Sequence, residues 1–225
     1  MGPRCFPTLE TTQKDLEYLR WQQKYKYFGI MPIFRYTEAI VSRIPETLSV
    51  GRDTQGKENH ELKIDLHKCR EEFEVLVTVL REIGLDVVEL PPDESCPNSP
   101  FVGDVAFVIN GMGVVTKPKS KERQAEVNTI RTVLKKELDI PVVEVTDEEA
   151  YVEGSDILFT GRELFVGISN YTNLAGARFV AGTFPEYPCS PIKVPGNFHL
   201  THYVNMASPD LICVGAGQDC QDIIK

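Results

Sequence analysis

The sequence lacks any long apolar run. No window approaches the roughly 18 consecutive apolar residues that a membrane-spanning helix requires. The N-terminus, MGPRCFPTLETTQKDLEYL, also has no short apolar core followed by a small-residue cleavage site. These absences predict a cytosolic protein that has no membrane partner.

Positive charge is scarce as well. The chain has 24 lysines and arginines against 33 acids, a net charge of -9 at pH 7. The basic residues are interleaved with acids, whereas nucleic-acid-binding proteins usually carry a basic stripe. The sequence therefore argues against a nucleic-acid partner and favours a small-molecule ligand, including a cationic one.

Closely spaced cysteine pairs are missing too. The six cysteines form no CxxC motif and are widely scattered, at positions 5, 69, 96, 189, 213 and 220. Neither a zinc ribbon nor a dense disulfide framework is indicated, so reduced thiols are expected. The 225 residues, 42% apolar and 25% charged, are typical of a soluble globular protein with one large domain or two small ones.

What the sequence does contain is an internal repeat. Residues 101–117, FVGDVAFVINGMGVVTK, hold two strand-like runs around Asn110-Gly111, the strongest short hairpin signal. The next segment carries apolar residues at helical spacing, namely Val127, Ile130, Leu134 and Leu138, and PVVEV follows as a buried strand. The unit is strand, strand, helix, strand.

Other copies of this unit lie before and after the one that begins at residue 101. The stretch YVEGSDILFTGRELFVG at 151–167, followed by TNLAGARFVAGTF and PIKV, repeats it 52 residues later. An earlier copy has a helix face, a C-capping glycine and the strand LDVVEL, but only YTEAIVS (36–42) precedes it. The face comprises Leu66, Cys69, Phe73, Leu76, Leu80 and Ile83, and the cap is Gly84. A fourth copy begins with HLTHYVNM and LICVGAG and stops at GQDCQDIIK, the opening turn of a helix.

A period of roughly 45 to 55 residues is that of propellers and arrays. We expect an α/β fold in which residues 34–225 form about three and a half ββαβ modules of a ring whose final portion is absent. Residues 1–33 do not repeat and are expected to be an appended surface helix or a partly ordered extension. Because an open ring exposes strand edges and apolar surface, we expect the chain alone to be poorly soluble or to need a partner.

Charged residues stand at equivalent places in the copies. Asp104, Asp156 and His199 each lie at or near the start of a hairpin, and Glu153 precedes Asp156 by three residues. A carboxylate beside a histidine fixes its tautomer and raises its pKa, which makes a general acid and base near neutral pH. Several enclosed carboxylates need a balancing cation, and a guanidinium pairs with them in bidentate geometry. The constellation predicts an arginine-like ligand.

Plainer interpretations of these residues remain open. An aspartate before a strand is usually a turn or capping residue, and a lone histidine is usually a core or surface residue. His202 forms an HxxH pair with His199, but no third ligand has suitable spacing, so no metal is expected. Arg123 is expected to be exposed on spacing alone, although the Lys-Pro-Lys-Ser loop before it can also fold over a central cleft.

Several segments resemble the dimethylarginine dimethylaminohydrolases of the pentein, or guanidino-modifying, superfamily: FVGDVAFV, ELPPDESCP, ILFTGRELFVGIS with TNLAGA, and PGNFHL. The resemblance runs from about Phe34 to Lys225. It implies a propeller of five ββαβ modules around a central site that hydrolyses N-omega-methylated arginine to citrulline and a methylamine. A cysteine thiolate attacks the guanidinium carbon, and water resolves the thiouronium intermediate, without metal or organic cofactor.

The resemblance also implies residue roles. His199 is the general acid and base, and Glu153 is its orienting carboxylate. Asp104 is expected to bind the substrate guanidinium and Arg123 its amino-acid end. Asp156, from its place in the repeat, and Asn98, which stands where the family has an aspartate, are also expected to bind substrate.

Departures from the family pattern leave two further hypotheses open. None of the six cysteines matches the family's nucleophile, which lies near the C-terminus in the fifth module. Gly103, Asn98 and Tyr171 stand where the family has a glutamate, an aspartate and an arginine that bind substrate, and Ser155 replaces a usual glycine. Each lost charge-assisted contact costs about 1.5 to 3 kcal/mol. The chain is thus either an incomplete hydrolase of this family or a non-catalytic binding or regulatory relative, and a structural repeat protein is a weaker third reading.

Overall fold

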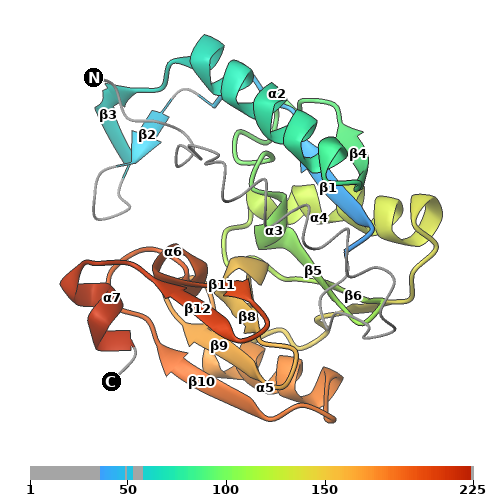
Figure 1. Cartoon of the computed structure of the whole chain (residues 1–225), viewed down its shortest axis with the longest axis vertical. Helices are drawn as coiled ribbons and strands as arrows, with labels where there is room; N and C mark the ends of the chain where they lie inside the picture. The colour runs from blue at the N-terminus through green and yellow to red at the C-terminus, as the bar shows by residue number, and fades with distance from the viewer. Residues whose placement is uncertain (1–35, 49, 53–57, 224–225) are drawn as a thin grey trace.

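The computed structural model describes residues 36–48, 50–52 and 58–223. The extension expected at 1–33 lies outside the described residues. In Figure 1 the unit around helix α2 and the unit around strands β8, β9 and β10 lie at opposite ends of the molecule, with β5 and β6 between them. Among the described helices, none is long and apolar enough to cross a membrane.

The middle unit has the predicted order of elements. Its parts are β5 (Ala106–Ile109), β6 (Met112–Val115), α4 (Glu126–Thr132) and β7 (Val142–Glu144). Strand β6 pairs antiparallel with β5 and parallel with β7. Asn110 and Gly111 have φ of 50° and 75°, which is the left-handed geometry of a two-residue hairpin turn. The expected hairpin is confirmed.

The helical region of this unit is less regular than the periodicity predicts. A 3-10 turn, η1 (Arg123–Ala125), precedes α4, and a π-helical turn, η2 (Val133–Glu137), follows it. The predicted apolar face is confirmed at Val127, Ile130 and Leu134, which are 7%, 3% and 0% exposed. The face therefore packs against the sheet as expected, while the turns at both ends change the helix type.

The following unit repeats the same topology. It consists of β8 (Ile157–Phe159), β9 (Leu164–Ile168), α5 (Leu174–Thr183) and β10 (Cys189–Lys193). Here β9 is the central strand, antiparallel to β8 and parallel to β10. Asn173 caps α5 by accepting a hydrogen bond from the Gly176 amide at 2.9 Å. The internal repeat of strand, strand, helix, strand is thus confirmed by sheet order.

The first unit matches the prediction only in part. Strand β1 (Glu38–Ser42) pairs in parallel with β4 (Asp86–Leu90), and α2 (Leu66–Glu82) connects them. Within α2 the buried residues are Cys69, Phe73 and Val77. Val77 was not in the predicted face, and Ile83, which was, is 40% exposed and lies past the helix end. A hairpin of β2 (Val50–Arg52) and β3 (Glu58–Lys63) was not predicted, because its sequence is polar and shows no clear alternation.

The last described elements are a hairpin and a helix. They are α6 (Leu200–Tyr203), β11 (Val204–Ser208), β12 (Leu211–Val214) and α7 (Gln218–Ile223). The expected opening of a helix after the hairpin is confirmed by α7. The segment HLTHY, which was read as the start of a strand, instead forms the short helix α6.

Similar short helical turns precede the hairpins β5–β6 and β8–β9. These are α3 (Val102–Val105) before β5 and η3 (Gly154–Asp156) before β8. Asp104 and Asp156 therefore lie near the start of a hairpin strand, as expected, and each is in the helical turn that enters the hairpin. A side chain added at Gly154 would place its Cβ 2.2 Å from the Gly103 carbonyl oxygen and 2.9 Å from that of Ala106. Glycine at 154 lets η3 pack directly against the α3 turn.

Candidate active site

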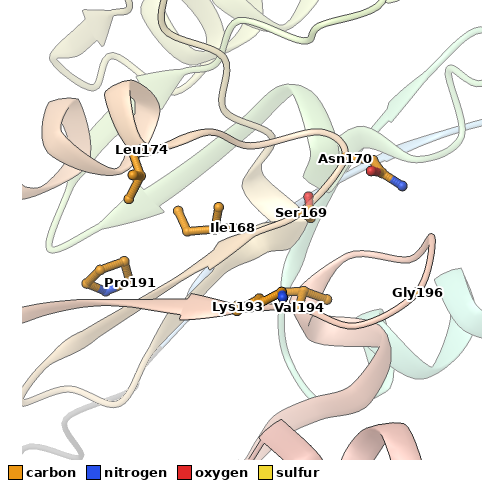
Figure 2. Close-up of a pocket in the computed structure, with 8 residues that line it drawn as sticks. All are labelled: Ile168, Ser169, Asn170, Leu174, Pro191, Lys193, Val194 and Gly196. Atoms are coloured by element: carbon orange, nitrogen blue, oxygen red, sulfur yellow. The ribbon is translucent and has the colours of Figure 1, made fainter.

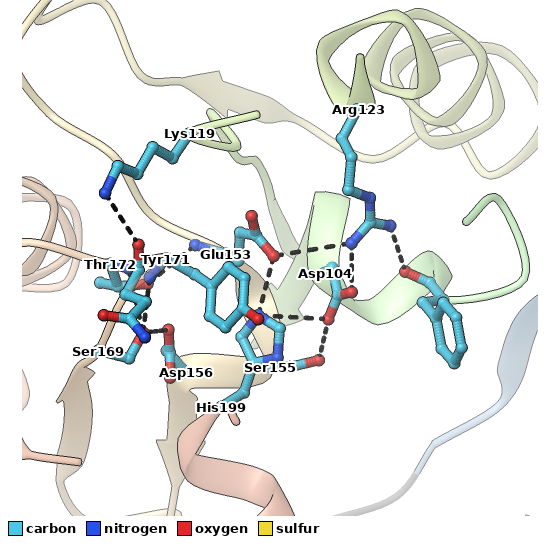
Figure 3. A network of polar contacts seen from close by, with 12 residues as sticks. Asp104, Lys119, Arg123, Glu153, Ser155, Asp156, Ser169, Tyr171, Thr172 and His199 are labelled. Carbon is cyan, nitrogen blue, oxygen red and sulfur yellow. Dashed lines mark hydrogen bonds and ion pairs between the residues drawn. The ribbon is translucent and has the colours of Figure 1, made fainter. Parts of the chain in front are cut away.

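Three helical turns, α3, η3 and α6, bring the candidate residues together. Asp104 lies in α3, Glu153 immediately precedes η3, and His199 is the N-cap residue of α6. One side-chain ligand atom from each of these residues lies within 4.8 Å of the others. Figure 3 shows the side chains pointing at one another. The predicted convergence of Asp104, Glu153 and His199 is confirmed.

The closest pair in this group is His199 and Glu153. The Nε2 atom lies 2.8 Å from Glu153 Oε2, and an ionised carboxylate only accepts, so Nε2–H donates. Glu153 is 1% exposed. Burial alone lowers the pKa of His199, but the hydrogen bond to Glu153 and the charges of Asp104, Asp156 and Glu153 outweigh it and raise the pKa overall. This arrangement gives an imidazole held in one orientation and protonated more readily than a free one.

Tyr171 covers one face of that imidazole. The ring centroids of Tyr171 and His199 are 4.2 Å apart with an interplanar angle of 21°. The tyrosine hydroxyl donates to the Asn197 carbonyl oxygen at 3.0 Å, which ties the ring to the loop before His199. At the position where the resemblance has a carboxylate-binding arginine, this chain has an aromatic ring that orients the histidine.

Asp104 is held from two sides. Its Oδ1 accepts a hydrogen bond from Ser155 Oγ, and its Oδ2 pairs with Nη1 of Arg123. Oδ1 also lies 4.0 Å from His199 Nε2. The main chain is fixed as well, since Thr116 Oγ1 donates to the Asp104 carbonyl oxygen at 2.9 Å. Ser155, noted in the sequence only as a replacement for glycine, is therefore a direct partner of Asp104.

Arg123 is buried among carboxylates. Its side chain is 11% exposed, so the exposure expected from spacing is wrong. Nε and Nη2 donate to the two oxygens of Glu126 at 3.2 and 2.8 Å, while Nη1 lies 3.6 Å from Glu153. Burial acts to lower the pKa of Arg123, but the hydrogen bonds and charges of Glu126 and Asp104 outweigh it and raise the pKa overall.

Glu126 was missed by the sequence analysis. Its side chain is only 6% exposed, and burial raises its pKa although the paired Arg123 opposes this. The one available signal was its position three residues after Arg123 in a helical segment, where the two side chains are neighbours. That spacing alone does not separate a buried pair from a solvated one.

Asp156 is enclosed by the chain beside the cluster. It is 0% exposed, and both carboxylate oxygens are used inside the chain. Oδ2 accepts from Ser169 Oγ at 2.6 Å and Oδ1 accepts from the Leu200 amide at 2.9 Å. Burial raises its pKa, although the His199 charge and these hydrogen bonds act the other way. Asp156 is thus hydrogen-bonded to the start of α6, the turn that follows His199, and its expected contact with a ligand stays a prediction.

Asn98 contributes through its main chain. Its carbonyl oxygen accepts a hydrogen bond from Arg123 Nη2 at 3.2 Å, and the side chain is half-buried. The structure therefore places Asn98 beside Arg123, and the expected side-chain contact with a substrate stays a prediction.

In the described part of the chain, His202 is not in the group of converging ligand atoms that Asp104, Glu153 and His199 form. Its ring stacks on Phe198 with centroids 4.0 Å apart, and burial together with the charge of His199 lowers its pKa. The Asp104, Glu153 and His199 atoms have a metal-like spacing. The guanidinium of Arg123 already contacts Asp104 and lies near Glu153, so a metal cation there would meet a positive charge.

Two hollows lie near the cluster. One, of about 290 Å³, is bounded by Asp104, Ser155 and Gly103 on one side and otherwise by apolar residues: Ile40, Val41, Phe73, Leu76, Pro100, Phe101 and Val102. The other, of about 500 Å³, is drawn in Figure 2. One of its lining residues, Ser169, donates a hydrogen bond to Asp156. Of the two, only the first reaches a residue predicted to bind substrate.

The described cysteines do not complete the cluster. Free thiols are present at Cys96, Cys189, Cys213 and Cys220. Burial raises the pKa of both Cys96 and Cys189, which disfavours a thiolate. None of these four is hydrogen-bonded to His199, Glu153 or Asp104. Within the described residues, the cluster supplies an acid-base pair and acceptors for a cation, but no activated nucleophile.

The fold of this chain is similar to that of solved structures of other proteins. A dimethylarginine dimethylaminohydrolase from Pseudomonas aeruginosa, solved as a cysteine-to-serine mutant complexed with citrulline, superposes with a TM-score of 0.72 over 84% of this chain and 75% of that chain, at 22% identity. The N-terminal domain of ArgZ, described as an arginine dihydrolase, superposes with a TM-score of 0.64 at 17% identity, over 76% of this chain and 63% of that chain. These similarities show a shared α/β fold.

Comparison of the sequence with known proteins identifies the family as well as the fold. The human protein named putative hydrolase DDAH2 is 37% identical over 192 residues, which cover 85% of this chain and 66% of the human protein. The N(G),N(G)-dimethylarginine dimethylaminohydrolase of Streptomyces coelicolor is 28% identical over 180 residues, covering 79% and 67%. The chain thus spans about two thirds of the length of these relatives. Since the sequence model of the family described as "N,N dimethylarginine dimethylhydrolase, eukaryotic" matches residues 46–222, this chain belongs to that family.

Proposed function

We propose that the protein takes part in hydrolysis of N-omega-methylated arginine, converting dimethylarginine and water to citrulline and dimethylamine. The observation that carries the proposal is the contact between His199 Nε2 and Glu153 Oε2 at 2.8 Å, next to Asp104. The names of the relatives favour the same reaction. The ligand is a small molecule, and the site needs no cofactor in this reaction. We also propose that the protein is cytosolic.

In the proposed mechanism Asp104 holds the guanidinium and Glu153 holds His199. A cysteine thiolate adds to the guanidinium carbon, and the departing dimethylamine takes the proton of His199 as the C–N bond breaks. His199 then removes a proton from water, which attacks the thiouronium carbon and releases citrulline and the thiolate. Asp156 acts as a positioning residue because it holds the start of α6. The thiol is not among the described residues of the cluster.

The family's five-module propeller is proposed on similar grounds. Two units share one sheet order, and the turns before three hairpins meet at the candidate site. Radial convergence of equivalent positions is what a propeller produces.

The second candidate function is a non-catalytic member of the family that binds a guanidine compound or regulates a partner. It is favoured by Gly103, Asn98 and Tyr171 at positions that the resemblance assigns to substrate-binding charged residues. It is also favoured by the lack of a hydrogen bond between His199 and any of the four free thiols within the described part of the chain.

Citrulline release from dimethylarginine separates the two. We expect the native protein, isolated from its source, to release citrulline, and expect His199→Ala to abolish this while His202→Ala, with its ring stacked on Phe198, retains it. The 225-residue chain by itself is expected to show no turnover. Native protein that binds dimethylarginine without forming citrulline would support the binding protein, and full activity in His199→Ala would remove the assigned acid-base role.

A further inference from the structure

The guanidinium of Arg123 makes the contacts expected of a bound ligand. Nε and Nη2 form a bidentate pair with Glu126, and Nη2 also donates to the carbonyl oxygens of Asn98 and Phe101 at 3.2 and 3.3 Å. Nη1 donates to Asp104 and lies 3.6 Å from Glu153. All three nitrogens of the planar fork are therefore matched with acceptors, which is the recognition pattern that suits a guanidinium.

The surrounding charges require such a cation. The side chains of Asp104, Glu126 and Glu153 are 9%, 6% and 2% exposed. Ionised carboxylates that are this poorly hydrated are costly unless a paired cation offsets them. The chain supplies that cation itself, from a residue directly after the exposed residues 119–122.

This arrangement conflicts with simultaneous binding of a second guanidinium. One oxygen of Asp104 is taken by Arg123 and the other by Ser155. A ligand guanidinium paired with Asp104 would also lie beside the positive charge of Arg123, in a site that excludes most water. Both cations cannot occupy the same carboxylates with full hydrogen bonding.

We propose that Arg123 is a built-in occupant of the guanidinium-binding carboxylates, and that an external guanidinium compound binds by displacing it. This inference rests on the proposed function only in that the ligand is a guanidinium compound. It differs from the role implied by the family resemblance, in which Arg123 binds the amino-acid end of the substrate. The two roles predict opposite effects of removing Arg123.

Binding of two ligands to Arg123→Ala tests the inference. Dimethylarginine carries an α-carboxylate and methylguanidinium does not. If Arg123 is an occupant, both ligands should bind Arg123→Ala at least about tenfold more tightly than wild type in calorimetry, because a charge-assisted competitor has been removed. If Arg123 instead recognises the α-carboxylate, dimethylarginine should bind the variant more weakly and methylguanidinium should be unaffected, and this outcome overturns the inference.

A chemical-rescue experiment adds an independent readout. Without Arg123 the three carboxylates lack their cation, so the Tm of Arg123→Ala should fall, and methylguanidinium chloride should restore it more than sodium chloride at equal ionic strength. Wild type should show no such difference. Arg131→Ala is the matched control, because Arg131 also pairs with a glutamate, Glu144, but is 32% exposed. No guanidinium-specific gain is expected there.

If Arg123→Ala does not fold, Glu126→Gln decides the question. This isosteric change removes the charge that holds the fork and should also tighten methylguanidinium binding. Unchanged affinity in Glu126→Gln, or a Tm of Arg123→Ala that methylguanidinium does not raise, overturns the inference. Tighter binding without citrulline release from the native protein leaves the inference intact and removes the proposed hydrolysis. Citrulline release by the native protein together with unchanged affinity in the variants overturns the inference and leaves the proposed hydrolysis intact.

Discussion

At the scale of single residues, the charge state of His199 connects the geometry of the cluster to its chemistry. Glu153 accepts a hydrogen bond from Nε2–H, and Asp104 and Asp156 add negative potential. The other ring nitrogen, Nδ1, has no hydrogen-bond partner among the described residues. Nδ1 is therefore the nitrogen that can exchange a proton with a ligand. The pKa of His199 determines the pH range in which this exchange can serve acid-base catalysis.

We expect the His199 imidazole to titrate above its ordinary pKa and His202 below it, because the acids outweigh burial at His199 alone. Histidine resonances followed by NMR across pH would measure both. In Glu153→Gln the pKa of His199 should fall, since the strongest stabilising contact of the imidazolium is lost, while that of His202 should change little. An unchanged His199 pKa in Glu153→Gln would contradict the assigned pair.

The same shift has a consequence for stability. A histidine whose pKa is higher in the folded state contributes stability that is fully present below the unfolded pKa, about 6.5, and is lost as pH rises through the folded pKa. The free energy of unfolding of wild type relative to His199→Gln should therefore decline as pH rises above this value. A relative stability that increases with pH would mean that His199 is held neutral.

At the scale of elements, the sequence predicts the helices and hairpins that have a clear apolar period or a characteristic turn sequence. The Asn110-Gly111 hairpin and the buried faces of α2 and α4 follow from local rules. The short turns α3, η3 and α6 do not, because three or four residues are too few to show a period. The hairpin β2–β3 also escaped, since its polar sequence carries no strand pattern.

The site was predictable to a similar degree. Repeat register and family resemblance identified Asp104, Glu153 and His199, and these three converge. The pairing of Arg123 with Glu126 and the full burial of Asp156 depend on tertiary packing, which spacing along the chain does not determine. The hydrogen bond from Ser155 to Asp104 joins residues 51 positions apart and had no local signal.

Gly154→Ala tests the contact between η3 and α3 on which the site depends. The added Cβ would lie 2.2 Å from the Gly103 carbonyl oxygen, and a main-chain atom cannot move aside as a flexible side chain can. We expect a loss of about 2 to 4 kcal/mol in the free energy of unfolding, measured with urea. Gly182→Ala is the control, because a Cβ there meets nothing within 4 Å in α5 and should be neutral or stabilising by up to about 1 kcal/mol.

If Gly154→Ala instead leaves stability unchanged, the close approach of the two turns is not a feature of the native protein. In that case the separation between Asp104 and Glu153 would also need revision, because these residues lie on the two turns that Gly154 allows to meet.

At the scale of the whole molecule, strand β12 of the last hairpin in the described part of the chain exposes large apolar side chains. Among the described residues β12 pairs with β11 alone, and Leu211 and Ile212 in it are 57% and 45% exposed. An exposed apolar edge strand presents unpaired main-chain groups to other chains. The sequence-based expectation that the chain alone is poorly soluble or needs a partner stays a prediction, and this edge is where we expect contacts between chains.

We expect the 225-residue chain to self-associate in a concentration-dependent manner in analytical ultracentrifugation, and expect Leu211→Lys with Ile212→Lys to shift it towards monomer. Lysine on an edge strand opposes edge-to-edge pairing because like charges meet. Val75→Lys is the matched control, since Val75 is 64% exposed but lies on helix α2, where the main chain is already hydrogen-bonded. Equal association of all three proteins would show that β12 is not the contact, and a wild-type chain that stays monomeric at every concentration would show that this exposed edge does not drive association.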